Sequence, residues 1–182
     1  SNNPRGIFGA DARISFATIK DGSSNTLALS ERAYGGDARM IKEGIATNSA
    51  MTTNGGERIA PAVCLAEVDP NNPKQYGGSV ANWSGRRWTH GSVQFMGFNT
   101  MLPPNGTSCN AAGWDMHNTV VNPTSYHPGG VNVALADGSV RFISETVDAG
   151  DPTVVEPRSG YSPYGVWGSL GSKGGGEPVP AP

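Results

Sequence analysis

Histidine, carboxylate and hydroxyl side chains are the groups of this sequence that could carry acid–base or nucleophilic chemistry. The sequence contains three histidines, His90, His117 and His127. Their spacing is not one typical of metal ligands. A catalytic serine, histidine and aspartate need closeness in space alone, so His127 with Asp137 or Asp115 is one candidate for a base and its orienting group. The alternative for His127 is a turn residue that hydrogen-bonds the backbone, because a Pro-Gly-Gly segment follows it.

The local motifs of common enzyme classes are absent from the sequence. We find no G-x-S-x-G, H-E-x-x-H, Walker or Rossmann pattern. Glycines at 168, 171 and 174 are spaced as in a phosphate-binding loop, but they follow no predicted strand and begin no predicted helix. A flexible terminal segment is the simpler interpretation. We therefore expect a protein that is not an enzyme.

Oxygen-rich loops offer a possible calcium site. Asp21 and Asp137 each lie in a loop with Gly next to them, but neither matches the twelve-residue spacing of an EF-hand. One interpretation is a structural calcium held by these two carboxylates. The other is ordinary turns, in which Asp side chains bond to nearby backbone groups. The residues themselves indicate no other cofactor.

Four tryptophans offer a possible ligand-binding surface, since an exposed indole face suits a sugar ring. They are Trp83, Trp88, Trp114 and Trp167. The first three lie in a Gly- and Asn-rich segment and are the candidates for a glycan platform. The alternative is core filling, because aromatic side chains contribute heavily to buried area.

The two cysteines, Cys64 and Cys109, form no C-x-x-C pair, which excludes a thioredoxin-type motif and a four-thiolate zinc site. One disulfide in an oxidising compartment would stabilise the fold by about 3 to 4 kcal/mol on the chain-entropy model. Two buried free thiols are the alternative.

The composition indicates a turn-rich, folded domain. Of 182 residues, 26 are Gly and 14 are Pro, and the net charge is only −2. So small a charge argues against disorder, and the 13 Lys and Arg against 15 Asp and Glu leave no basic field for nucleic acid. No apolar stretch approaches the roughly 18 residues that span a bilayer.

Hydrophobic alternation predicts the elements that position these residues. The clearest is a β-hairpin over 130–143, in which Asp137-Gly138 is expected to form a type I′ turn. Shorter strands are predicted over 14–19, over 26–32 with Leu27 and Leu29 alternating with smaller residues, and around 93–97. Together they predict a β-rich α+β fold, an antiparallel sheet with long Gly- and Asn-rich loops.

Four segments, in order, resemble a large planctomycete family of unknown function whose members begin with a type IV prepilin-like leader and helix. Residues 19–31 (IKDGSSNTLALSE) are similar to its ITDGTSNTLLVGE segment, and residues 98–109 to its N-T-x-L-P-P-N-x-x-x-C stretch. Residues 127–138 show its His, nine residues, Asp-Gly signature, and 167–177 are similar to its terminal L-x-T-R-x-G-G-E, with Ser or Lys in place of Arg. The motif positions are Asp21, Gly22, Asn25, Glu31, His127, Asp137 and Gly138.

The resemblance implies a pilin-like globular head over 1–177 that lacks the N-terminal helix, followed by a flexible tail over 178–182. It implies a periplasmic or cell-surface location and pilin-like subunits or surface proteins as partners, with contact to the membrane only through the missing helix. The family has no established catalytic residues, and the calcium-stabilised loop of some pseudopilins makes Asp21 and Asp137 its candidate ligands. We therefore expect a non-catalytic structural or interaction subunit of a pilus-like or surface assembly. The alternatives are an exported glycan- or solute-binding module and a hydrolase in which His127 faces a carboxylate and a hydroxyl.

Overall fold

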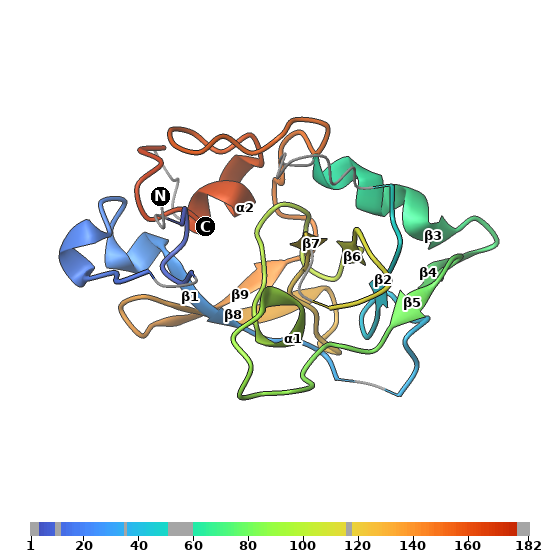
Figure 1. The fold of residues 1–182 in the computed structure, drawn as a ribbon. Helices are drawn as coiled ribbons and strands as arrows, with labels where there is room; N and C mark the ends of the chain where they lie inside the picture. Colours follow the sequence, from blue (N-terminus) through green and yellow to red (C-terminus); the bar gives the residue numbers. More distant parts are fainter. Residues whose placement is uncertain (1–3, 10–11, 35, 51–59, 116–117, 178–182) are drawn as a thin grey trace.

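The computed structural model describes residues 4–9, 12–34, 36–50, 60–115 and 118–177. Within them the fold is the expected β-rich α+β type, with short helices and mostly antiparallel sheets joined by long loops (Figure 1). The expected tail over 178–182 lies outside the described residues. No helix among the described residues is long and apolar enough to cross a membrane.

A three-stranded antiparallel sheet positions most of the motif residues. Its order is β1 (Leu27–Ser30), β8 (Gly130–Leu135) and β9 (Val140–Ser144), so β1 and β9 are its edge strands. Three turns of 3₁₀-helix are also described: η1 (Phe16–Thr18), η2 (Ser23–Asn25) and η4 (Pro61–Glu67). Two short α-helices follow later in the chain, α1 (Val93–Met96) and α2 (Gly165–Leu170).

A second, mixed sheet has the order β5 (Val80–Ala81), β2 (Ile45–Ala46), β6 (Cys109–Asn110) and β7 (Thr119–Val120). The β2–β6 pair is parallel and the other pairs are antiparallel. A separate hairpin joins β3 (Val68–Asp69) to β4 (Asn72–Tyr76).

Two hydrophobic clusters form the core. One packs the inner face of the three-stranded sheet against α2 through Trp167 and Leu170, and the other surrounds Cys64, Tyr76 and Cys109. The buried indole Nε1 of Trp167 donates a hydrogen bond to the Leu102 carbonyl oxygen at 2.8 Å, which connects the two clusters. Trp167 is thus a core residue, as the core-filling interpretation predicts for it.

The predicted hairpin is confirmed, but its turn is not type I′. The N–H of Gly138 donates to the Leu135 carbonyl, and Gly138 has φ of +87°, whereas Asp137 is not among the residues with positive φ. This is a three-residue loop in which a type I turn is followed by a left-handed glycine. Asp137 favours it because its Oδ1 accepts hydrogen bonds from the N–H and the hydroxyl of Ser139.

The predicted strand over 26–32 is present as β1, but Leu27 and Leu29 do not share a face. The register shifts between them, which marks a β-bulge. Leu27 therefore lies in the core opposite Leu135, whereas Leu29 lies opposite Ala134 on the outer face and is exposed.

Two predicted strands are wrong. The segment around Phe16 forms η1, because the Thr18 hydroxyl and N–H both bond to the Ser15 carbonyl and favour a tight turn, and the Phe16 ring is exposed. The segment 93–97 forms α1, in which Gly97 N–H donates to the Val93 carbonyl. Alternation over so few residues does not distinguish a strand from one helical turn.

Candidate functional site

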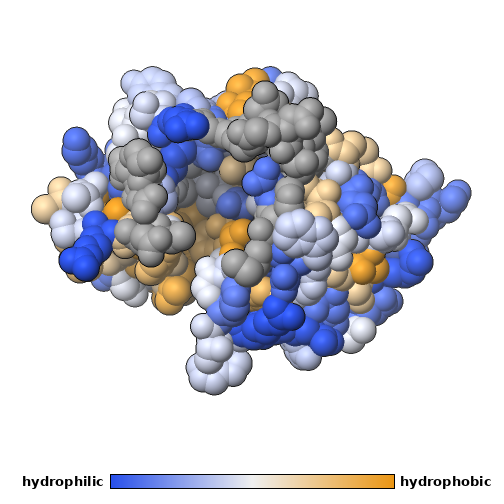
Figure 2. Space-filling view, viewed as in Figure 1, coloured by the Kyte–Doolittle hydropathy of each residue, from blue (hydrophilic) through white to orange (hydrophobic). Residues whose placement is uncertain are grey.

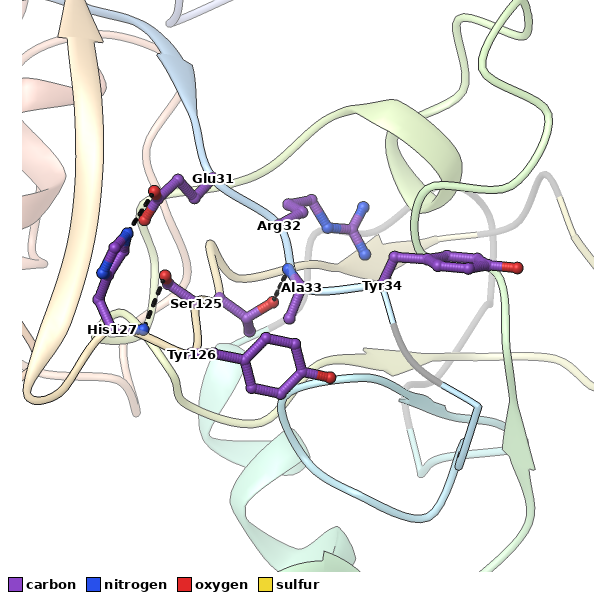
Figure 3. Close-up of a pocket in the computed structure, with 8 residues that line it drawn as sticks. Glu31, Arg32, Ala33, Tyr34, Ser125, Tyr126 and His127 are labelled. Atoms are coloured by element: carbon purple, nitrogen blue, oxygen red, sulfur yellow. Dashed lines mark hydrogen bonds and ion pairs between the residues drawn. The ribbon is translucent and has the colours of Figure 1, made fainter.

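The motif residues Glu31 and His127 meet at the end of the three-stranded sheet. Glu31 directly follows β1, and two residues separate His127 from the first residue of β8. Because β1 and β8 are antiparallel neighbours, these two ends lie side by side. Nε2 of His127 lies 3.2 Å from Oε1 of Glu31, and Figure 3 shows the imidazole turned toward this carboxylate.

Asn132, on β8, holds the Glu31 carboxylate. Its N–H donates to Oε2 at 2.8 Å and its side-chain amide to Oε1 at 3.1 Å. Burial pushes the pKa of Glu31 upward, but the hydrogen bonds from Asn132 and the Ser125 hydroxyl and the nearby His127 outweigh it, so the pKa lies below its ordinary value. Glu31 is therefore a charged, hydrogen-bonded acceptor at neutral pH.

The Ser125 hydroxyl does not complete a catalytic triad. Its Oγ accepts the main-chain N–H of His127 at 3.1 Å, and it hydrogen-bonds to Glu31. A nucleophile would instead need its hydroxyl against the imidazole. The carboxylates considered from the sequence do not orient His127 either, since Asp137 bonds to Ser139 and Asp115 pairs with Arg87. The carboxylate that faces His127 is Glu31.

Sequence reasoning missed Ser125 and Asn132, which complete this junction. Ser125 lies two residues before His127, the spacing at which a hydroxyl reaches a main-chain N–H in a turn, so it carried a usable signal. Asn132 is the one strongly polar position on the inner strand β8, which is otherwise Gly, Val, Ala and Leu.

A shallow depression of about 460 Å³ lies beside the junction and is wide open to solvent. It is lined by Glu31, Arg32, Ala33, Tyr34, Thr124, Ser125, Tyr126 and His127 (Figure 3). Tyr126 hydroxyl donates to Oε1 of Glu43 at 2.6 Å, and the Thr124 hydroxyl accepts the Ala33 N–H. Most polar groups of the wall thus already form hydrogen bonds or ion pairs within the protein.

Arg32 points from this wall toward α1. Its Nη1 donates to the carbonyl oxygens of Val93, Gln94 and Gly97 at 3.0 to 3.3 Å. Burial lowers the pKa of Arg32 to about 10, against a smaller opposing effect of Tyr76. This guanidinium therefore caps the carboxyl end of α1.

Asp21 forms a second junction between distant motifs. Its Oδ2 and Oδ1 accept the N–H groups of Gly175 and Gly176 at 2.7 and 3.0 Å. The loop has the shape for this because Gly22 has φ of +93°, and the Asn25 side chain donates to the Asp21 carbonyl. The 19–31 segment thus fixes the terminal glycine-rich segment.

The two carboxylates considered as calcium ligands face different partners. Asp21 binds the N–H groups above, and Asp137 is exposed at its turn. Within the part of the chain that is described, no three His, Cys, Asp or Glu side chains gather into a metal-binding group. The bonds of Asp137 to Ser139 are those of an ordinary turn, whereas those of Asp21 are long-range, and calcium binding stays a prediction.

The cysteines form the disulfide Cys64–Cys109, which joins η4 to β6 with both residues fully buried.

Among the tryptophans considered for ligand binding, Trp83 is partly buried, whereas Trp88 and Trp114 are exposed. His90 packs edge-on against the Phe95 ring, with ring centroids 5.3 Å apart. His117 lies outside the described residues.

A larger hollow of about 1090 Å³ lies beside the edge strand β1. Its wall includes Leu27, Leu29, Val93, Met96 and Phe98, and Figure 2 shows apolar surface within a hollow on this side of the molecule. Its wall also includes His90 and the ion pair of Arg5 Nε with Oε1 of Glu156, which are 3.0 Å apart.

A family model matches residues 1–150 and is described as SBP_bac_10, Protein of unknown function (DUF1559). The chain belongs to this family. No curated protein and no solved structure matches the chain. The DUF1559 match contains Glu31, His127, Asp21 and both cysteines, whereas Gly175 and Gly176 lie beyond it.

Proposed function

We propose that this DUF1559 protein is the globular part of a pilin-like, extracytoplasmic structural subunit that acts by contact with neighbouring subunits or surface proteins and catalyses no reaction. The proposal combines the resemblance to prepilin-like proteins with the use that the structure makes of the motif residues. Asp21, Glu31 and His127 connect segments far apart in the chain. Holding these segments together accounts for each of the three residues, and no substrate is needed to explain them.

One observation carries the proposal: the outer face of the three-stranded sheet carries a row of exposed apolar side chains that runs across all three strands. Leu29, Ala134 and Val140 are cross-strand neighbours in one row, and Phe142 lies opposite Asn132 in the next. Leu29, Val140 and Phe142 are 62%, 68% and 51% exposed. Both edge strands contribute, so the apolar row reaches from one side of the sheet to the other.

Such a face suits contact with a like surface. Contiguous exposed apolar side chains on a soluble domain mark interaction sites, and open edge strands favour pairing with another chain. Repeated copies that met through the β1 and β9 sides of the sheet would form a head-to-tail series, which is the geometry of a filament. The disulfide favours an oxidising, extracytoplasmic location.

Site-specific photo-crosslinking in the intact gene product, expressed in its own cells, tests the proposal. A photoreactive residue at Val140 is expected to give products that contain a second copy or another surface protein. The matched control is Lys74, an exposed position on β4 outside this sheet, which is expected to give few. Equal yields at both positions, with the protein dispersed rather than assembled, would overturn the proposal.

A further inference from the structure

We propose that Trp88 and Trp114 form a stacking platform for a neutral polysaccharide chain, a binding site separate from the apolar sheet face. The two indoles are 78% and 61% exposed. They lie in different loops, 83–90 and 111–115.

An ion pair joins the two loops directly beside the indoles. Nη1 of Arg87 contacts Oδ2 of Asp115, so the residues that adjoin Trp88 and Trp114 are in contact. The Arg87 guanidinium also lies over the Phe95 ring, 4.8 Å from its centroid, and Phe95 is buried. The pair is thereby anchored to the core, and it links the two loops that carry the indoles.

The first loop is fixed in shape. Arg86 N–H donates to the Trp83 carbonyl, His90 N–H to the Arg87 carbonyl, and Gly85 N–H to the Phe95 carbonyl. Arg87 itself has φ of +52°, a left-handed conformation that is uncommon for a residue other than glycine. The fold tolerates this backbone conformation and gains the contacts of the Arg87 side chain with Phe95 and Asp115. A platform held in this way loses little conformational entropy when a ligand binds.

The chemistry of the platform suits sugar rings. An indole offers a flat apolar face with a polar edge, which matches the C–H face and the hydroxyl rim of a pyranose. Arg87 and Asp115, which adjoin the two indoles in sequence, offer a donor and an acceptor, and their charges compensate each other. A compensated pair favours a neutral glycan over a polyanion, whose binding would need a basic surface.

Binding of the whole protein to soluble polysaccharides tests this proposal. Affinity electrophoresis and tryptophan fluorescence would be measured against neutral polymers (dextran, xylan, a β-1,3-glucan) and against an acidic one (alginate). We expect a neutral polymer to bind and each of Trp88→Ala and Trp114→Ala to weaken it about five- to tenfold, the worth of one aromatic contact. Thermal unfolding of both variants is expected to match the parent protein, because both side chains are exposed.

Phe16→Ala is the matched control. Phe16 is 74% exposed and lies in η1, away from the two loops, so its removal is expected to leave binding unchanged. An equal loss with Phe16→Ala would overturn the platform, and so would the absence of binding to every neutral polymer. Binding of alginate alone, abolished by salt, would instead identify an electrostatic surface at Arg86 and Arg87. Since Val140 takes no part here, failure of this test leaves the crosslinking test of the proposed function unaffected.

Discussion

The carboxylate of Asp21 accepts the N–H of Gly175 across a sequence separation of 154 residues, at 2.7 Å. It also accepts the N–H of the neighbouring Gly176, so one side chain connects the 19–31 segment to the glycine-rich segment at 174–176. The resemblance placed Asp21 and these glycines in separate motifs, and the structure shows them in contact. The contact has a direct consequence for stability.

Asp21→Ala is expected to lower the free energy of unfolding by about 1 to 3 kcal/mol, because two N–H groups lose a charged acceptor. Thermal or denaturant unfolding measures the change. Asp151→Ala is the matched control, since Asp151 bonds only locally to Thr153 among the contacts seen and is expected to cost clearly less. Equal losses in the two variants would show that the long-range contact contributes nothing.

Glu31 makes stability depend on pH with a definite sign. Its pKa is lowered below 4.5 in the folded protein, so the charged form is favoured by folding. The stabilisation is present above the unfolded pKa and is lost as the pH falls through the folded one. Glu31→Gln is therefore expected to destabilise the protein at pH 7, and the difference from the parent is expected to shrink below about pH 4.5, the ordinary pKa of a glutamate. Denaturant unfolding from pH 3 to 8 measures both.

Glu67 provides the control of opposite sign. Burial raises its pKa, so folding disfavours the charged form, and this destabilisation is present above the folded pKa and disappears at low pH. Glu67→Gln is expected to stabilise the protein at pH 7 and to converge with the parent in acid. Two variants that shift stability in the same direction would contradict this account of Glu31.

How far the sequence could predict this site depends on the range of the interaction. The 130–143 hairpin was predictable because its strands alternate and Asp-Gly is a turn former next to them. The contact of Glu31 with His127 was not, since periodicity says nothing of which chain ends meet, although the resemblance had marked both residues. For Asp21 the sequence leaves a calcium ligand and a turn residue both open, because a carboxylate in a glycine-rich loop suits a cation and a backbone N–H equally well. The contact of Asp21 with Gly175, 154 residues along the chain, follows from neither local pattern.

The disulfide is expected to supply a large share of the stability. Replacing Cys64 and Cys109 together by Ala should lower the free energy of unfolding by about 3 to 4 kcal/mol, because the bond restricts the unfolded chain. The native protein should react with no thiol reagent before reduction, as neither cysteine is free. A reactive thiol in unreduced, denatured protein would contradict the bond.

A chelator is expected to leave the melting temperature unchanged. The Asp21 oxygens that would coordinate calcium each accept an N–H group, and a cation in their place would have to displace Gly175 and Gly176. Calorimetry with EGTA and with added calcium measures this. A fall of several degrees with EGTA that calcium reverses would show that a calcium site exists, and Asp137→Ala would then test whether that carboxylate takes part.

The turn of the hairpin can be tested at two adjacent residues. In a type I′ turn both central residues need positive φ, so Asp137→Gly would be tolerated or even favourable. In the turn seen here, Asp137→Gly removes the acceptor of the Ser139 N–H and hydroxyl and is expected to destabilise the protein. Gly138→Ala is expected to cost about 1 to 2 kcal/mol from its backbone conformation alone, because φ is +87° and a Cβ there would meet no atom within 4 Å. Gly138→Asn should cost less, since Asn tolerates the left-handed region. Denaturant unfolding of the three variants measures these effects. If Asp137→Gly stabilised the protein, the turn would be of type I′ and not the one described here.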